Sequence, residues 1–355
     1  MIEIDGSYGE GGGQILRTAV SLSALTLQPI RITKIRAGRP KPGLKRQHIA
    51  GIELTGRLVN AEIKGLEIGS ETIEFKPGER GAGIFDYDIG TAGSVSLVLQ
   101  AVLPPAILSD EPVGFRLRGG TDVSWSPPVD YLREVFVPIL ARMGPRLAII
   151  QERRGHYPKG GGKVSVDTTP CEKISPASFV DFGNLKTVSG ISHCVKLPPH
   201  VAERQAESAE DILSERGLSF QSIVRESYQR HNDPHLGPGS GIVLWAESDT
   251  GNRLGADVLG SKGKRAELVG SEAARRLVQD LSTTKAIDSH LCDMLIPYMA
   301  LAKGESLMGV TEVTSHLTTN IWVAHHILGA EIDIQGQVGS PGLVRIRGVG
   351  LSLAQ

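Results

Sequence analysis

The sequence predicts an α/β (α+β) protein in which three repeated βαβαββ units form one large domain and a smaller α/β domain is inserted into the third unit. Three observations predict this class. Apolar residues alternate between the period of a strand and the period of a helix, in the same order three times. The 43 glycines and 20 prolines supply many turns. The 355 residues are enough for one large or two ordinary domains.

The first unit begins with a short apolar strand that enters a glycine-dense turn between Gly9 and Gly13. This turn opens a helix whose apolar positions recur with a period near 3.6. A second strand and a second helix follow, and two strands close the unit. We expect strands at 1–4, 30–35, 61–68 and 72–75 and helices at 13–25 and 45–58.

The second unit repeats this order. Its first helix is predicted to end before Pro104 and Pro105, because proline cannot continue the hydrogen bonds of a helix. Its second helix is predicted to begin at Pro128, since proline is favoured in a first turn. We expect strands at 86–89, 113–118, 146–152 and 163–167 and helices at 93–103 and 128–143.

The third unit is interrupted by a segment that does not follow the βαβαββ order of the other two units. Its own elements are expected to be strands near 179–182 and at 307–313, 332–335 and 343–347, with helices at 288–302 and 315–328. The interrupting segment is expected to hold strands at 188–196, 221–230, 241–248 and 254–259 and helices at 201–215 and 266–281. We therefore predict a repeat-built domain from residues 1–183 and 281–355 and an inserted smaller domain from residues 184–280.

Composition limits the setting of the protein. The net charge is −1, so the chain as a whole is not strongly basic. Cys171, Cys194 and Cys292 are an odd number at wide spacing, which fits a reducing compartment better than a disulfide framework. The N-terminus has no charged-then-apolar leader, and the longest apolar stretch, at 95–108, contains polar residues and prolines. We expect a soluble, cytoplasmic protein with no membrane partner.

The first glycine turn has the features of an anion site. Backbone N–H groups at a helix N-terminus attract negative charge, and no acidic residue lies between Gly11 and Ile52, where eight arginines and lysines fall. Glu10 is unusual in a phosphate cradle and suggests a divalent metal between the carboxylate and bound phosphates. The alternative is that the glycines only form the turn and Glu10 caps the helix.

Two further motifs suggest chemistry. Arg36 and Arg39 are held between glycines and prolines, an arrangement suited to bidentate phosphate binding. His316 is predicted in the first turn of a helix, on one face with Thr319 and Asn320. The helix dipole opposes protonation there, and a neutral histidine can act as a nucleophile. The alternative is a polar residue at a helix N-terminus with no catalytic role.

Five segments together resemble the RNA 3′-terminal phosphate cyclase family. They are residues 9–17 (GEGGGQILR), 36–48 (RAGRPKPGLKRQH), 119–122 (GGTD), 157–162 (YPKGGG) and 315–320 (SHLTTN). The resemblance extends over essentially the whole chain. It implies three repeats like the C-terminal domain of a bacterial translation initiation factor, with a small thioredoxin-like inserted domain. It also implies that ATP adenylates an RNA 3′-terminal phosphate and that the neighbouring 2′-hydroxyl then closes a 2′,3′-cyclic phosphate.

The resemblance also implies roles for individual residues. His316 would be the nucleophile that takes AMP, and Glu10 would hold a divalent metal, Mg²⁺ or Mn²⁺, against the ATP phosphates. The residues implied to bind ATP or the RNA terminal phosphate are Arg17, Arg36, Arg39, Gln47, Gln100, Pro128, Asp130, His290, Leu291, Cys292, Asp293 and Met294.

The chain departs from the family pattern in one segment. His290 stands where a tyrosine can stand, and Met294 stands where a glutamine can stand. A histidine can still stack on adenine, whereas a methionine cannot form a strong hydrogen bond to it.

Two other functions are compatible with such a chain. One is a catalytically silent relative that binds RNA as a scaffold, and the other is an enzyme that uses the same repeat for enolpyruvyl transfer. The first should have lost some of the site residues. The second has no use for a nucleophilic histidine.

Overall fold

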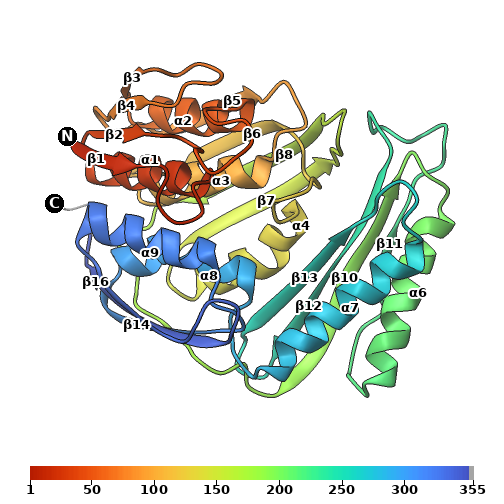
Figure 1. Ribbon diagram of the computed structural model, residues 1–355. Helices are drawn as coiled ribbons and strands as arrows, with labels where there is room; N and C mark the ends of the chain where they lie inside the picture. The colour runs from red at the N-terminus through yellow and green to blue at the C-terminus, as the bar shows by residue number, and fades with distance from the viewer. Residues whose placement is uncertain (352–355) are drawn as a thin grey trace.

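The computed structural model describes residues 1–351 and contains four sheets of four strands each. Three of the sheets share one strand order. In each of them the first strand of the unit pairs with the second, the second with the fourth, and the fourth with the third, giving β1-β2-β4-β3, β5-β6-β8-β7 and β9-β14-β16-β15. Figure 1 shows these units packed into one body, with the fourth sheet and its helices beside it. The predicted threefold repeat is confirmed.

The first unit follows the predicted order closely. It consists of β1 (Ile2–Asp5), α1 (Gln14–Thr26), β2 (Ile30–Thr33), α2 (Arg46–Leu58), β3 (Glu62–Lys64) and β4 (Ile73–Lys76). Strand β2 buries alternate residues, Ile30 and Ile32, as expected for a strand with one face on the core. Helix α1 is buried over almost its whole length, because helices of the other two units pack against it.

The second unit differs from the prediction at its helices. It consists of β5 (Gly83–Asp88), α3 (Val95–Ile107), β6 (Val113–Gly119), α4 (Val129–Tyr131), the π-helical segment η1 (Leu132–Phe136), α5 (Val137–Ala141), β7 (Arg146–Arg153) and β8 (Gly162–Thr169). The predicted end of the first helix at Pro104 is wrong. The helix continues to Ile107 with both prolines buried, because packing on nearly every side outweighs the two backbone hydrogen bonds that the prolines remove.

The predicted helix at 128–143 is also not one regular helix. Pro138 has no N–H to donate to the carbonyl of Glu134, one turn earlier. That carbonyl instead accepts a hydrogen bond from Arg253 of the inserted segment. The missing bond and its replacement from outside coincide with the π-helical turn at this point.

The third unit consists of β9 (Ser178–Phe179), α8 (Ser289–Leu301), β14 (Lys303–Val310), α9 (Ser315–Leu328), β15 (Glu331–Gln335) and β16 (Gly342–Val349). Its opening strand is shorter and earlier than predicted, and it pairs in parallel with β14. The inserted segment holds β10 (Leu185–Val195), α6 (His200–Glu215), β11 (Val224–Glu226), β12 (Gly239–Ser248), β13 (Arg253–Leu259) and α7 (Ala266–Ser282).

The inserted segment has its own sheet, in the order β11-β10-β12-β13, and its own cluster of buried apolar side chains beneath α6 and α7. A βαβ unit is followed by two antiparallel strands and a helix, which agrees with the thioredoxin-like arrangement implied by the family resemblance. A larger apolar cluster runs through all three repeats. We propose on this basis that residues 184–280 form the smaller domain and that 1–183 and 281–355 form the larger one; residues 352–355 lie outside the described part of the chain.

Within residues 1–351, none of the helices combines the length and the apolar character needed to cross a membrane.

The close crossing of α6 and α7 gives a test of the packing in the inserted segment. A Cβ atom added at Gly270 of α7 would lie 1.9 Å from the backbone oxygen of Gln205 in α6. We expect Gly270→Ala to lower the free energy of unfolding by about 1–3 kcal/mol, because the helices must move apart. Urea denaturation followed by circular dichroism measures this change. Gln279→Ala, on the exposed face of α7, is the control and should leave the transition in place.

Candidate active site at the junction of the repeats

The N-terminal ends of α1 and α9 meet across more than three hundred residues of sequence. The turn that carries Glu10 lies against α9, because Gly9 adopts φ +58° and has no side chain. A Cβ atom at Gly9 would be 2.5 Å from Oγ1 of Thr319. The glycine turn therefore brings the first and third repeats close enough for their side chains to contact one another.

Three side chains meet at this contact. The carboxylate of Glu10 accepts a hydrogen bond from Arg39, and its other oxygen, Oε2, lies 3.0 Å from Nδ1 of His316. Thr314 caps α9 by accepting the backbone N–H of Leu317 at 3.0 Å, so His316 is held in the first turn. About half of the His316 side chain remains exposed. The carboxylate therefore lies at the Nδ1 edge of the imidazole, while other parts of the side chain are open to solvent.

The electrostatic surroundings favour a neutral His316. Burial, together with the positive charges of Arg17 and Arg39, lowers the pKa of the imidazole below its ordinary value, while Glu10 opposes this shift. The N-terminal end of a helix dipole also disfavours a cation. An imidazole that is unprotonated at neutral pH keeps a lone pair for attack on an electrophile.

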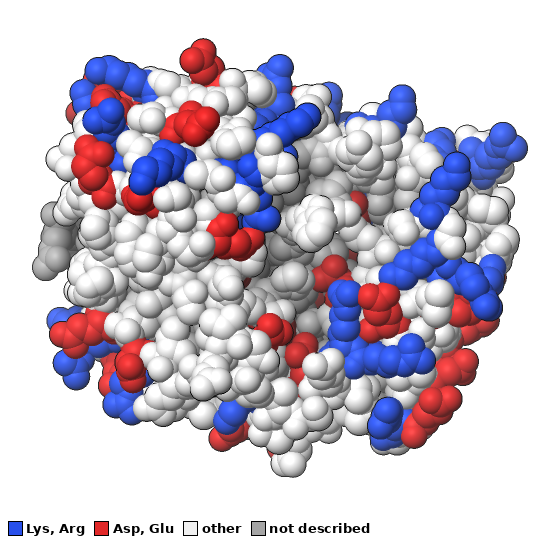
Figure 2. Space-filling view, in the orientation of Figure 1, with Lys and Arg blue, Asp and Glu red and all other residues white. Residues whose placement is uncertain are grey.

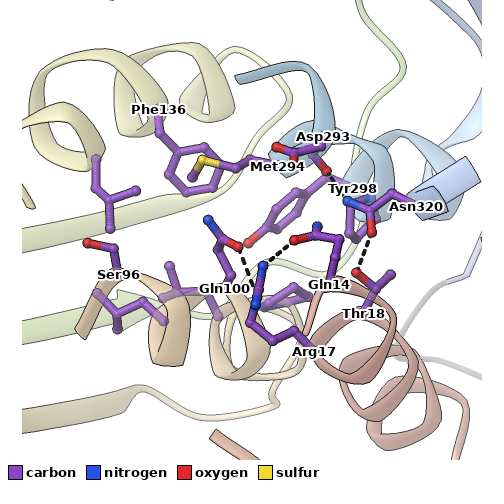
Figure 3. Close-up of a pocket in the computed structure, with 15 residues that line it drawn as sticks. Gln14, Arg17, Thr18, Ser96, Gln100, Phe136, Asp293, Met294, Tyr298 and Asn320 are labelled. Atoms are coloured by element: carbon purple, nitrogen blue, oxygen red, sulfur yellow. Dashed lines mark hydrogen bonds between the residues drawn. The ribbon is translucent and has the colours of Figure 1, made fainter. Parts of the chain in front are cut away.

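A pocket that is partly open to solvent lies beside this contact, between α1, α3, η1, α8 and α9. Figure 3 shows Arg17 directed toward Gln14 and Gln100, and it donates a hydrogen bond to each of them. Burial lowers the pKa of Arg17 to about 10, against the attraction of Asp293 and Glu10, so the side chain is still a cation at neutral pH. The cavity thus has one fixed positive charge in a largely apolar wall.

The opposite wall comes from α8, where Asp293 and Met294 line the cavity. Burial raises the pKa of Asp293 to about 7, although His290 and Arg17 oppose the shift. Leu291 and Cys292 are buried in the core behind this wall.

His290, one turn earlier on α8, lies 3.2 Å from the carboxylate of Asp257 in the inserted segment. Burial disfavours the charged imidazole, but the hydrogen bond and charge of Asp257, with Asp288 and Asp293, outweigh burial and raise its pKa to about 9. His290 is therefore a cation at neutral pH, in contrast to His316.

Four residues implied by the family resemblance lie elsewhere or have other partners. Arg36 is buried and donates to the carbonyl oxygens of Lys41 and Gly43, both at 2.8 Å, so its guanidinium holds its own loop together. Gln47 accepts the backbone N–H of Ser94 at the start of α3, at 3.3 Å. Pro128 and Asp130 are buried at the start of α4, where Asp130 is paired with Arg133 and Arg154.

The structure adds residues that the sequence interpretation did not assign to the site. Asn320 of α9 accepts a hydrogen bond from Thr18 of α1 at 2.6 Å and donates to the backbone oxygen of Asp293 at 2.8 Å (Figure 3). It therefore links three of the helices around the cavity. The spacing that placed Asn320 on one face with His316 was a signal for this role, but its partners come from distant parts of the chain.

His48 is a second residue of this kind. Its Nδ1 accepts the backbone N–H of Lys45 at 3.1 Å, and its ring packs against Gly13 in the glycine turn. Burial, with Arg17, Arg36 and Lys45 nearby, lowers the pKa of His48 to about 3. His48 is therefore a neutral side chain that packs against the glycine turn.

The donor set suits a hard divalent cation. Mg²⁺ is commonly held by one or two carboxylates together with substrate phosphates. Glu10 supplies such a carboxylate beside His316 and Arg39. Of the residues at this contact, Glu10 is therefore the one that could hold a metal next to bound phosphates.

The Glu10–His316 contact gives a direct prediction. Because the carboxylate stabilises the protonated imidazole, we expect Glu10→Gln to lower the pKa of His316 further. Titration of ¹³C-labelled histidine followed by NMR measures this pKa. Glu3→Gln, on the exposed edge of β1, is the control and should leave the His316 titration unchanged. A His316 pKa that rises or stays constant in Glu10→Gln would contradict the geometry described here.

Comparisons with known proteins agree over almost the full chain. The model of the family described as RNA 3'-terminal phosphate cyclase matches residues 8–334. A protein named RNA 3'-terminal phosphate cyclase from Methanopyrus kandleri is 55% identical over 348 residues, which cover 98% of this chain and 99% of the relative. One of the same name from Ignicoccus hospitalis is 53% identical over 350 residues, covering 98% and 99%. A third, from Staphylothermus marinus, is 50% identical over 354 residues, covering 99% of both chains.

Among solved structures, the enolpyruvyl transferase NikO from Streptomyces tendae aligns with 98% of this chain and 48% of its own, at 12% identity and a TM-score of 0.38. A similarity of that size supports no argument. The family match and the relatives, by contrast, span the repeats and the inserted segment alike. This chain belongs to the RNA 3'-terminal phosphate cyclase family.

Proposed function

We propose that this chain uses ATP to convert an RNA 3′-terminal phosphate to a 2′,3′-cyclic phosphate, through a covalent histidine–AMP intermediate on His316. The observation that carries the proposal is the contact of His316 with Glu10 at the start of α9, beside a cavity that contains Arg17. The names of the relatives support the overall reaction. The neutral state of His316 supports its role as nucleophile.

In the first step, Nε2 of His316 attacks the α-phosphorus of ATP. A P–N bond forms, the bond to the bridging oxygen breaks, and pyrophosphate leaves. Oε2 of Glu10 lies 3.0 Å from Nδ1, and its negative charge would favour a proton on that nitrogen, so that Nε2 is the nitrogen with the free lone pair. Arg39 and Arg17 would offset the negative charge that builds up on the phosphates.

In the second step, an oxygen of the RNA terminal phosphate attacks the phosphorus of the histidine–AMP. The P–N bond breaks, and the RNA end becomes joined to AMP through a phosphoanhydride. In the third step, O2′ attacks the terminal phosphorus and AMP leaves. The 2′-hydroxyl is already adjacent to that phosphorus, so closure is intramolecular and has a high effective concentration. A covalent intermediate divides one difficult transfer into easier ones.

A divalent ion, Mg²⁺ or Mn²⁺, would be held by Glu10 and would supply charge neutralisation to the triphosphate. The adenine base would lie in the cavity against Met294, with Gln100 and Arg17 on the facing wall. The three cysteines are free and buried, which supports a reducing compartment such as the cytoplasm.

Replacement of the nucleophile tests the covalent step. We expect wild-type protein incubated with [α-³²P]ATP and Mg²⁺ or Mn²⁺ to carry an acid-labile label, and His316→Ala to lose it by roughly 10³-fold or more. His326→Ala on the same helix is the control and should retain the label. Absence of label in the wild type would favour a silent RNA-binding relative, whereas label in His316→Ala would place the nucleophile elsewhere.

The RNA end tests the later steps. We expect an RNA with a 3′-hydroxyl to be inert, because it has no terminal phosphate to accept AMP. An otherwise identical RNA with a 3′-phosphate should yield a 2′,3′-cyclic end and one AMP per end, measured by gel mobility and resistance to phosphatase. An RNA whose last nucleotide lacks the 2′-hydroxyl is the matched control and should stop as the adenylated RNA. Turnover of the 3′-hydroxyl RNA would indicate strand joining instead.

A further inference from the structure

A second polar cluster lies between the second repeat and the inserted segment, and the proposed reaction does not use it. Its members are Asp122, after β6, His156, between β7 and β8, and His193, within β10. Each offers one donor atom, and these atoms all lie within 4.8 Å of one another. The exposed fractions are 1%, 7% and 0%, so the cluster is closed to bulk solvent.

The two histidines lack the hydrogen bonds that buried imidazoles normally make. Neither Nδ1 nor Nε2 of His193 has a hydrogen-bond partner in the described chain, and Nε2 of His156 has none either. The two rings lie with their centroids 5.2 Å apart. Because buried polar groups are nearly always satisfied, nitrogens that converge on a carboxylate without partners point to a missing ligand.

The protonation states match those of metal ligands. Burial lowers the pKa of both histidines, and Arg154 adds to this effect at His193, so both rings are neutral. Burial opposes ionisation of Asp122, but Arg154 and the two histidines outweigh it and hold the pKa of that carboxyl well below its usual range. One ionised carboxylate and two neutral imidazoles are donors suited to zinc and similar divalent metals.

The charges around the cluster leave room for a cation. Arg154 is buried and contacts three carboxylates, lying 3.2 Å from Asp122, 2.6 Å from Asp130 and 2.6 Å from Glu226. Arg133 also pairs with Asp130, at 2.8 Å, so two guanidinium groups face these three carboxylates. The same Arg154 and the hydroxyl of Thr121, which donates to Asp122 at 2.6 Å, fix the orientation of the Asp122 carboxylate as outer-shell groups do in metal sites.

We propose that Asp122, His156 and His193 bind one divalent transition-metal ion, Zn²⁺ as the first candidate, which joins the inserted segment to the second repeat. Asp122 and His156 belong to the repeat, and His193 belongs to the sheet of the inserted segment. Gly239, the first residue of β12 in the inserted segment, packs directly against the His156 ring, because a Cβ atom at Gly239 would be 2.0 Å from Cγ of His156. The three protein donors leave a fourth position for a water molecule.

Metal content of the full-length chain tests the proposal independently of ATP and RNA. The protein is purified without a metal-affinity tag, stripped with EDTA, incubated with Zn²⁺ and passed through a desalting column. We expect about one Zn²⁺ per chain by mass spectrometry of the metal. Co²⁺ in place of Zn²⁺ should give the intense visible absorption of a tetrahedral site. Removal of the metal should lower the melting temperature, and Zn²⁺ should restore it.

Variants locate the ion. His193→Ala and Asp122→Asn should each lower the Zn²⁺ affinity by at least about 10-fold and remove the Co²⁺ absorption. His231→Ala, at an exposed histidine, is the first control and should retain the metal. Glu10→Gln is the second control and tests whether the ion binds at Glu10 instead; it should also retain the metal. Circular dichroism shows that each variant is folded. Wild-type protein without bound Zn²⁺, or folded His193→Ala with wild-type binding, would overturn the proposal.

Discussion

The contact between the glycine turn at Gly9 and helix α9 is the constraint on which the rest of the site depends. A Cβ atom at Gly9 would lie only 2.5 Å from the Thr319 hydroxyl oxygen, so the turn can approach α9 this closely only without a side chain. This approach brings the Glu10 carboxylate to His316 although the two residues are far apart in sequence. Arg39 reaches the same carboxylate from the loop after β2. The first and third repeats therefore supply a carboxylate and an imidazole to one place, the carboxylate from just before the first helix of its unit and the imidazole from the start of the second helix of its unit.

The surroundings divide the titratable groups of this region by charge state. His316 and His48 are kept neutral by burial and nearby arginines, whereas His290, beside Asp257, is a cation. Arg17 keeps its charge inside a mostly apolar cavity. The reaction that we propose would need fixed positive charge for the phosphates and an uncharged imidazole for the attack, and this fold supplies both because each group has different neighbours.

The inserted segment is part of this electrostatic design as well as a separate sheet. Asp257 of β13 is the partner of His290, and Arg253 takes the carbonyl that Pro138 leaves free in the second repeat. Figure 2 shows acidic and basic side chains interspersed over one face of the molecule, with a hollow between the repeats and the inserted segment. The Asp122–His156–His193 cluster lies where these two parts meet. Buried polar contacts of this kind fix the relative position of the two parts more specifically than apolar packing alone.

The sequence by itself determined the order of the strands and helices and the threefold repeat, because hydrophobic periodicity is a local property and recurs in each unit. It also identified Glu10, Arg17, Arg39 and His316 as candidates, since glycine turns and helix starts can be recognised from adjacent residues. Only the tertiary structure decided the partners. It turned Arg36 inward onto its own loop, paired Asp130 with Arg154 rather than with the cavity, and carried α3 through two prolines. These outcomes depend on packing between segments that are distant in sequence, and no local pattern records which distant group satisfies a buried charge or a free carbonyl.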